Sequence, residues 1–426
     1  MFDERLTGMV ATLLSFGALF ASALFFLIGG GMLNTQLSLR MTQVGFSTPT
    51  IGITMACYFL GLVMGYFFCH RLIERVGHIR SFAVFAAAAT AIVILHGLYL
   101  SAIFWACLRF FNGITNFGLY MVIESWLNEC SQRQTRGRVF SAYMTLTYLG
   151  IGSGQLFINF GNGGGRNVLF IAALFFCLSL IPVSVTRSVH PELPRTAGYN
   201  FKSLFHKVPV GMLGCLVSGL TNSAFFSMAP VFGTKIGLSV FQLSWFMSIT
   251  VIGGFAVQWI VGIVSDRFDR TLILFMEAVL TALLGIFILI CNGSSYYRFL
   301  VEMAIFGGLI FAVYPVAVAR ANDVLESRDA VAVSSALILC YSIGAVFGPI
   351  LASALMALSK SPYGLYVYWS LVSGLFAAAT LYLKLREKIM VVPVPEQVNF
   401  VPLKNTSPVA MVLDPRADVG GEKEKN

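Results

Sequence analysis

The stretch Gly262-Ile263-Val264-Ser265-Asp266-Arg267-Phe268-Asp269 ends one long apolar run of this chain, and Glu74-Arg75-Val76-Gly77 follows another, 192 residues earlier. In both copies an acidic residue and an arginine come directly after the apolar segment. Glycines repeat at an offset of 194 residues: Gly113 with Gly307, Gly150 with Gly344, and Gly154 with Gly348. This repetition predicts two halves with the same internal architecture.

The composition places both halves in a membrane. Hydrophobic residues make up 57% of the 426 residues and charged residues only 11%, whereas a soluble protein has about 25% charged residues. A membrane-spanning helix needs about 20 apolar residues. Twelve such runs lie at roughly 8–34, 46–69, 79–100, 101–126, 138–160, 167–186, 208–233, 238–264, 271–291, 297–318, 331–357 and 362–384.

We therefore predict an all-α membrane protein with twelve transmembrane helices in two pseudo-symmetric six-helix bundles. Residues 1–186 form the first bundle and residues 208–384 the second, joined by a cytoplasmic linker at 187–207. The polar, proline-containing tail at 385–426 cannot bury a core and is expected to be disordered and cytoplasmic. The N-terminus lacks a basic region and a cleavage site, which favours a retained first helix over a signal peptide.

The basic residues predict the orientation. With both termini in the cytoplasm, 22 of the 28 Lys and Arg residues lie on the cytoplasmic side. One, Arg109, lies within a helix, and five lie in outer loops: Arg40, Arg166, Lys235, Arg298 and Lys360. This asymmetry is typical of multi-pass membrane proteins, and it explains the net charge of +9 without a nucleic-acid partner.

The fourth apolar run carries a polar stripe. Residues at steps of three or four share one face of a helix, and that face presents Arg109, Asn112, Asn116, Tyr120 and Glu124. A charge inside a bilayer costs at least about 2.5–3.5 kcal/mol and is expected to face a cavity or a partner. We interpret these residues as the lining of a substrate cavity. The alternative for Arg109 is a structural role, bonding backbone carbonyls or the first helix.

Three acids within apolar runs are candidates for proton coupling: Glu124, Glu277 and Glu302. Each also has a structural interpretation. Glu124 lies near the cytoplasmic end and could pair with loop arginines, and Glu277 with another cytoplasmic basic residue. Glu302 is four residues from Arg298, at the spacing of a local ion pair on a helix.

Four further polar residues are candidates for the cavity: Asn34, Gln36, Gln155 and Asn222. Asn34 and Gln36 end the first apolar run, where polar side chains also satisfy the backbone of a helix terminus. The other two lie on the fifth and seventh runs. There, hydrogen bonds between helices are the alternative interpretation.

No enzyme motif is present. The segment around Ser153 does not match Gly-x-Ser-x-Gly, and the chain lacks a zinc-protease motif and an ATP-binding loop. The eight cysteines lie mostly in apolar runs without a Cys-x-x-Cys pair, which indicates core residues and no metal framework. We predict no enzymatic activity, cofactor or metal, and transport driven by a gradient or running downhill.

These motifs resemble those of the major facilitator superfamily over about residues 8–384. The stretch from Gly262 keeps the first Gly and the Asp-Arg of the loop motif Gly-x-x-x-Asp-Arg-x-Gly but ends in Asp269, and Arg109 to Gly113 matches the helix-four motif Arg-x-x-x-Gly. The elements Leu33-Asn34-Thr35, Glu124-Ser125 and Arg136-Gly137-Arg138 are similar to those of a bacterial branch, the YcaD-like transporters. The antiporter motif Gly-x-x-x-Gly-Pro is complete only at Gly344 to Pro349, in the eleventh helix.

The resemblance implies a twelve-helix transporter whose halves rock about a central site. It also implies a cytoplasmic gate built from Glu74, Arg75, Asp266 and Arg267. In such a gate each acid holds the N-terminus of a helix in the opposite half: Glu74 that of the eleventh helix, and Asp266 that of the fifth. Such contacts are favourable, because the partial positive charge at a helix N-terminus attracts a carboxylate.

We expect a monomeric secondary active transporter in the cell membrane, the inner membrane in a Gram-negative bacterium. It would move a small organic solute with protons, and a cavity rich in aromatic residues and poor in charge favours efflux. Facilitated or proton-coupled uptake of a small solute or monocarboxylate is the alternative. A membrane sensor that keeps the fold and only binds its ligand is a different class. The expected partners are a small molecule, protons and membrane lipid.

Overall fold

The computed structural model describes residues 16–131, 136–161, 165–185, 205–291, 295–324, 330–386, 397 and 400. These residues form helices throughout, with short connections. The first half contains α2 (Gly17–Gln43), α3 (Thr48–Val76), α4 (His78–Leu98), α5 (Ala102–Cys130), α6 (Arg136–Phe157), the short η1 (Ile158–Gly161), α7 (Arg166–Leu178) and α8 (Leu180–Val185). The second half contains α10 (Pro209–Lys235), α11 (Val240–Ser265), α12 (Arg270–Ile290), α13 (Tyr296–Val324), α14 (Ala330–Leu358) and α15 (Gly364–Leu385).

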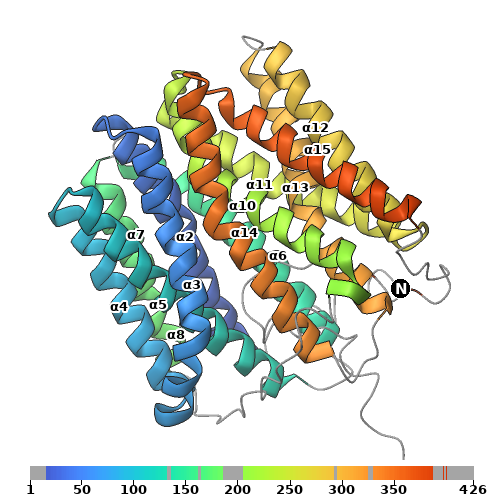
Figure 1. Ribbon diagram of the computed structural model, residues 1–426. Helices are drawn as coiled ribbons and strands as arrows, with labels where there is room; N and C mark the ends of the chain where they lie inside the picture. Colours follow the sequence, from blue (N-terminus) through green and yellow to red (C-terminus); the bar gives the residue numbers. More distant parts are fainter. Residues whose placement is uncertain are drawn as a thin grey trace, which may run out of the picture.

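Figure 1 shows α2 to α5, α7 and α8 together on one side and α10 to α15 on the other, and α6 packs on α2 and on α11 between them. With α7 and α8 counted as one segment, the described residues contain the twelve long helical segments that the apolar runs predict. Ten of these are long and apolar enough to cross a membrane. The other two, α5 and α6, have sufficient length but carry the polar side chains of the candidate site. The start of the first predicted run and most of the linker and tail lie outside the described residues.

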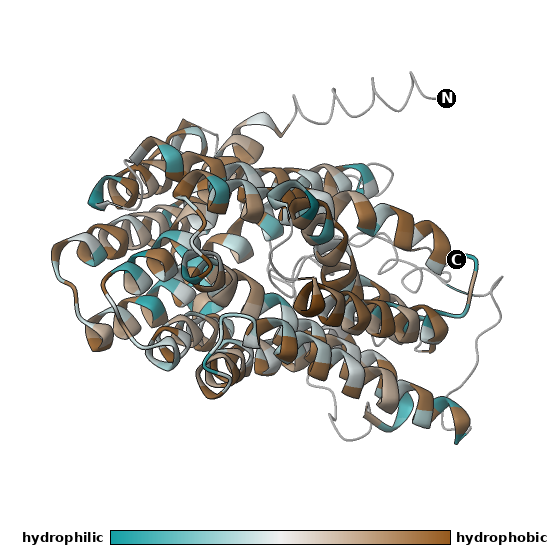
Figure 2. Ribbon diagram, turned by 90° about the horizontal axis from the view of Figure 1, so that it is seen from above, coloured by the Kyte–Doolittle hydropathy of each residue, from teal (hydrophilic) through white to brown (hydrophobic). Residues whose placement is uncertain are grey.

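The outer surface is apolar, as contact with lipid requires. Figure 2 shows hydrophobic residues along the outward-facing helices. Large apolar side chains are well exposed there, among them Phe111 on α5, Trp259 on α11 and Leu375 on α15. In water such a surface would be unfavourable, and in a bilayer it is solvated by lipid tails.

The repeat seen in the sequence also appears at the helix starts. Ser47 and Ser239, which are 192 residues apart, cap α3 and α11, and each side chain accepts a hydrogen bond from the backbone three residues on. The glycine two residues before each cap has a positive φ, +88° at Gly45 and +83° at Gly237. Both turns therefore need glycine for the same reason.

The repeat extends to the helix crossings. A Cβ at Gly113 would lie 2.1 Å from the Tyr58 carbonyl oxygen, so α3 and α5 are in backbone contact. At the equivalent crossing of α11 and α13, a Cβ at Gly307 would lie 2.2 Å from the Thr250 carbonyl oxygen. The repeated glycines are therefore positions where two helices touch, which is how small residues act in membrane bundles.

We predict that Gly113→Ala destabilises the protein by about 1–3 kcal/mol, because the new methyl group overlaps a rigid backbone. Gly30→Ala is the matched control, since nothing lies within 4 Å of a Cβ added there. Unfolding of the purified protein in mixed micelles measures both changes. Equal stability of the two variants would contradict the tight α3–α5 crossing.

Candidate functional site

The two halves meet through α2, α3 and α6 on one side and α10, α14 and α11 on the other. We call the end of the molecule where α3 and α11 finish the basic end, because Arg71, Arg75, Arg267 and Arg270 lie there. Among the described residues, side-chain hydrogen bonds join the halves toward the other end, and a further one, between Tyr148 of α6 and Gln258 of α11, lies nearer the basic end. Lys235 at the end of α10 donates to Thr48 at the start of α3 (2.5 Å), and Ser244 on α11 donates to Asn159 (3.4 Å).

The polar stripe on α5 is buried, and its arginine is held by neighbouring helices. The Arg109 side chain is only 1% exposed. It donates to the Asn34 side-chain oxygen on α2 (2.7 Å) and to that of Asn112 (3.2 Å). The guanidinium lies 4.3 Å from the centre of the Tyr58 ring on α3, and Asn116 donates to the Tyr58 hydroxyl (3.3 Å). The arginine therefore joins α2, α3 and α5.

The charge of Arg109 has no carboxylate partner within the described part of the chain. All of its contacts there are to neutral groups: two amide oxygens and an aromatic ring. Two buried N–H donors of the cluster, Arg109 Nε and Asn112 Nδ2, also have no acceptor among the described residues. A buried cation without a counter-ion is costly. The arrangement can therefore accept a group that brings negative charge.

Glu124, at the other end of the stripe, is fully buried. It accepts a hydrogen bond from the Tyr143 hydroxyl of α6 (2.9 Å). It also lies close enough to Tyr314 on α13 for an electrostatic interaction across the interface between the halves. A carboxylate in this position responds to movement of one half against the other.

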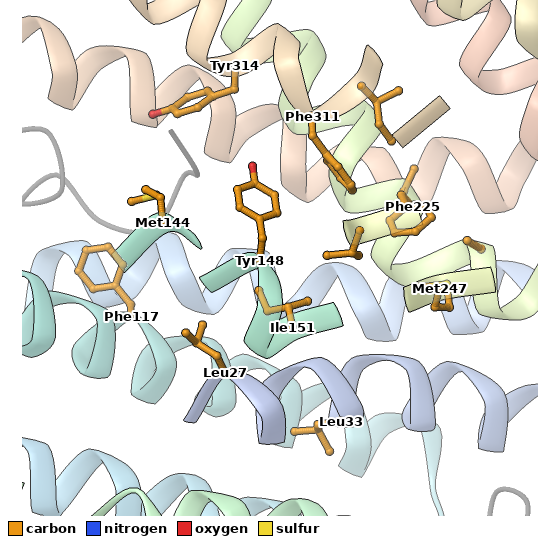
Figure 3. Close-up of a cluster of buried hydrophobic side chains, with 14 of the residues drawn as sticks. Leu27, Leu33, Phe117, Met144, Tyr148, Ile151, Phe225, Met247, Phe311 and Tyr314 are labelled. Atoms are coloured by element: carbon orange, nitrogen blue, oxygen red, sulfur yellow. The ribbon is translucent and has the colours of Figure 1, made fainter. Parts of the chain in front are cut away.

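Aromatic residues pack across the interface between the two halves. Figure 3 shows Tyr148 of α6 pointing toward Phe311 and Tyr314 of α13 in the other half. The Tyr148 ring stacks on Phe255 of α11 at 4.8 Å between ring centres, and its hydroxyl is hydrogen-bonded to the Gln258 side chain. This surface can bind an apolar or aromatic group and offers few charges.

The other predicted cavity residues lie in two kinds of surroundings. Asn34 belongs to the arginine cluster, and Asn222 on α10 is hydrogen-bonded to Ser218 (3.1 Å) and to Tyr341. Gln155 instead links α6 to α2 by hydrogen bonds. Its side chain donates to the Gly31 carbonyl (3.0 Å) and accepts from the Thr35 hydroxyl, both on α2.

Two more predicted residues lie elsewhere on the first half. Gln36 lies within α2 and not at its end, and it donates to the backbone at Gly165 (3.1 Å). Tyr120, on the α5 stripe, packs edge-on against Phe26 at 4.9 Å between ring centres and interacts electrostatically with Tyr341 of the other half. The contacts of Gln155 agree with the alternative of hydrogen bonds between helices, whereas Gln36 bonds another segment and not the end of its own helix.

The two remaining acids lie in the second half. Arg298 donates to Glu302 (2.9 Å), which is the local ion pair that the i, i+4 spacing indicates. Glu277 on α12 is 3% exposed, and neither carboxyl oxygen has a hydrogen-bond partner among the described residues. The pairing of Glu277 with a cytoplasmic basic residue is therefore not seen in the described chain.

At the basic end, Asp266 lies in a network that the sequence did not indicate. The fully buried Arg270 donates to Asp266 (2.9 Å) and to Asp323 at the end of α13 (2.5 Å). Arg267, by contrast, is exposed, as are Glu74 and Arg75 at the equivalent loop of the first half. The two copies of the loop therefore have different surroundings in this conformation.

Sequence reasoning missed Tyr58, Tyr143, Arg270 and Asp323. Arg270 follows Asp266 by four residues, a spacing that favours an ion pair, and this signal was available. Tyr58 and Tyr143 look like any aromatic residue in an apolar run, and only the packing of their helices reveals their partners. Among the described residues, no group of three or more His, Cys, Asp or Glu side chains could hold a metal ion.

Comparison with known proteins agrees with this architecture. Residues 19–349 match the model of the Major Facilitator Superfamily. The chain is 28% identical over 331 residues to the "Uncharacterized MFS-type transporter YcaD" of Salmonella arizonae and also to that of Salmonella typhimurium. Each match covers 76% of this chain and 84% of the relative.

Solved structures share the fold. The D-xylose–proton symporter has a TM-score of 0.69 at 15% identity, covering 88% of this chain and 98% of that one. The nucleoside transporter NupG has a TM-score of 0.67 at 13% identity, covering 86% and 98%. The family match spans both halves and the candidate site. The chain therefore belongs to the Major Facilitator Superfamily, and it is a multi-pass membrane transporter and not an enzyme.

Proposed function

We propose that this protein is a monomeric, proton-coupled secondary transporter that moves a small organic solute across the cell membrane by alternating access. The excess of basic residues supports a cytoplasmic location for the basic end and both termini. Three of the side-chain bonds between the halves lie toward the opposite end, at Ser38, Lys235 and Ser244. This supports an inward-facing conformation, in which solute enters between the halves from the cytoplasm.

One observation carries the proposal: α5 holds two buried charges of opposite sign on one face. Arg109 and Glu124 are fifteen residues apart, about 22 Å along a helix, so they do not neutralise each other. Glu124 is hydrogen-bonded to Tyr143 of the first half and interacts electrostatically with Tyr314 of the second. A buried carboxylate at a moving interface suits proton binding and release. Glu277, with no partner in the described chain, is a second candidate for this role.

The aromatic interface favours export of an amphipathic solute. Tyr148, Phe255, Phe311 and Tyr314 offer ring faces from both halves. Such a surface favours the binding of solutes with large apolar groups, and it lacks the several basic groups that a polyanion would need. The solute would bind there from the cytoplasmic side.

A specific observation favours a second candidate, proton-coupled uptake of a monocarboxylate. Arg109 has only neutral partners in the described chain, and two buried donors beside it have no acceptor. One carboxylate would satisfy the charge and both donors. Together with a proton on Glu124, this would make transport electroneutral.

We predict that Glu124→Gln separates solute movement from proton movement. In proteoliposomes with an imposed pH gradient and an internal pH dye, two probes are added in turn: short-chain monocarboxylates and neutral aromatic solutes. The native protein should give solute-dependent proton flux, and the variant should lose at least about 90% of it while exchanging labelled solute. The control is Glu302→Gln, whose acid already pairs with Arg298.

The outcomes of this experiment separate the candidates. Proton flux with monocarboxylates alone selects the second candidate, and flux with neutral aromatic solutes selects the first. Full proton flux in Glu124→Gln would contradict the role of this residue. Solute binding without flux of either kind would contradict transport and favour the sensor.

A further inference from the structure

A residue of the C-terminal tail binds at the basic end of α11. The backbone N–H of Phe400 donates to the Asp266 carboxylate at 2.8 Å. The Phe400 side chain is partly buried and packs against the hydrophobic core. The tail is therefore attached at this residue to the acid of the repeated loop motif.

The Phe400 ring fits a space that a glycine leaves open. A Cβ added at Gly262 would lie 2.4 Å from the ring, and its three nearest atoms would all belong to Phe400. Any other residue at position 262 would displace the ring. A backbone hydrogen bond and a ring over a glycine are two independent contacts at one site.

The Phe400 site lies on the face of α11 that contacts the first half. Phe255 and Gln258 of α11 contact Tyr148 of the first half. The next residue on the same helix face, at a step of four, is Gly262. Phe400 thus covers the next position, toward the basic end, on the face of α11 that contacts the first half. There it occupies the surface that would face α6 if the halves closed at that end.

We propose that the tail segment at Phe400 is a wedge that holds the basic ends of the two halves apart. The inference rests on the alternating access proposed above. For the basic end to close, α6 must approach the Gly262 surface and the Asp266 carboxylate beside it. Phe400 occupies both the surface and an oxygen of this carboxylate, Oδ1, which also accepts from Arg270. It therefore has to leave before closure.

Hydrogen–deuterium exchange of the full chain in lipid nanodiscs tests the wedge without any solute or proton gradient. Phe400→Ala removes the ring, and Phe400→Pro removes the ring and the N–H that binds Asp266. In both variants we expect several-fold slower exchange at 136–145 of α6, because the basic end closes more often and α6 is then covered by α11. Phe268→Ala, which removes an exposed phenylalanine from the same end, should leave this exchange unchanged.

Each other outcome overturns the proposal. Unchanged exchange at 136–145 in both Phe400 variants would show that Phe400 does not hold the two halves apart. Faster exchange at 136–145 would show that Phe400 favours closure of the basic end. A failure of the proton-flux experiment would leave these results untouched, since exchange reports only the conformation.

Discussion

Arg109→Gln is expected to reduce solute-dependent flux in proteoliposomes about a hundredfold. The glutamine keeps a polar side chain but loses the positive charge, the bond to Asn34 and the contact with the Tyr58 ring. Hydrogen bonds to a charged group contribute about 1.5–3 kcal/mol, and a tenfold change corresponds to about 1.4 kcal/mol. The loss of a charged contact to the solute would therefore account for most of this effect.

The matched control is Arg298→Gln. Arg298 is also an arginine within a helix, but its side chain is 46% exposed and pairs with a carboxylate, Glu302. We expect flux within about threefold of the native value, because exposed ion pairs contribute little. Flux in Arg109→Gln similar to that of this control, in protein that folds normally, would assign Arg109 a purely structural role.

Asp323→Asn is expected to lower the free energy of unfolding by about 3–5 kcal/mol, the usual cost of breaking a buried ion pair. The Arg270 side chain is fully buried and its Asp323 partner is 1% exposed. Without the Asp323 charge, the Arg270 guanidinium retains its ion pair with Asp266, whose side chain is 37% exposed, and its hydrogen bond to the Ala319 carbonyl. The substitution therefore leaves a buried cation poorly compensated.

Lys384→Gln provides the comparison for this prediction. Lys384 pairs with Asp269 at 3.2 Å, near Arg270, but its side chain is 44% exposed. Its loss is expected to cost at most about 1 kcal/mol. Unfolding in mixed micelles measures both variants, and an Asp323→Asn variant as stable as Lys384→Gln would rule out a strong buried network at the basic end.

Much of the fold was predictable from the sequence because lipid imposes simple rules. Runs of about 20 apolar residues become helices, since no water is present to satisfy an open backbone. The glycine repeats at Gly113 and Gly307 correctly indicated two equivalent halves, and the Arg-x-x-x-Gly motif indicated the family. The Arg298–Glu302 pair was also predictable, because i, i+4 contacts need only one helix.

The candidate site was only partly predictable. The buried polar face of α5 follows from helical spacing, so Arg109 and Glu124 were found. Their partners, Asn34, Tyr58 and Tyr143, lie on other helices, and sequence spacing does not tell which helices touch or at what height. Gln155 shows the same limit: its polarity was compatible with a cavity or with a bond between helices, and the structure shows hydrogen bonds that join α2 and α6.

The sequence by itself thus determined the membrane class, the twelve apolar runs, the repeat and the charged helix face, since each depends on local composition and periodicity. Only the tertiary structure decided that Arg109 lacks a carboxylate partner in the described chain, that Arg270 is buried between two acids, and that Phe400 lies over Gly262. Each of these depends on helices or segments distant in the chain. Burial makes such contacts energetically important, and burial is a property of the packed bundle.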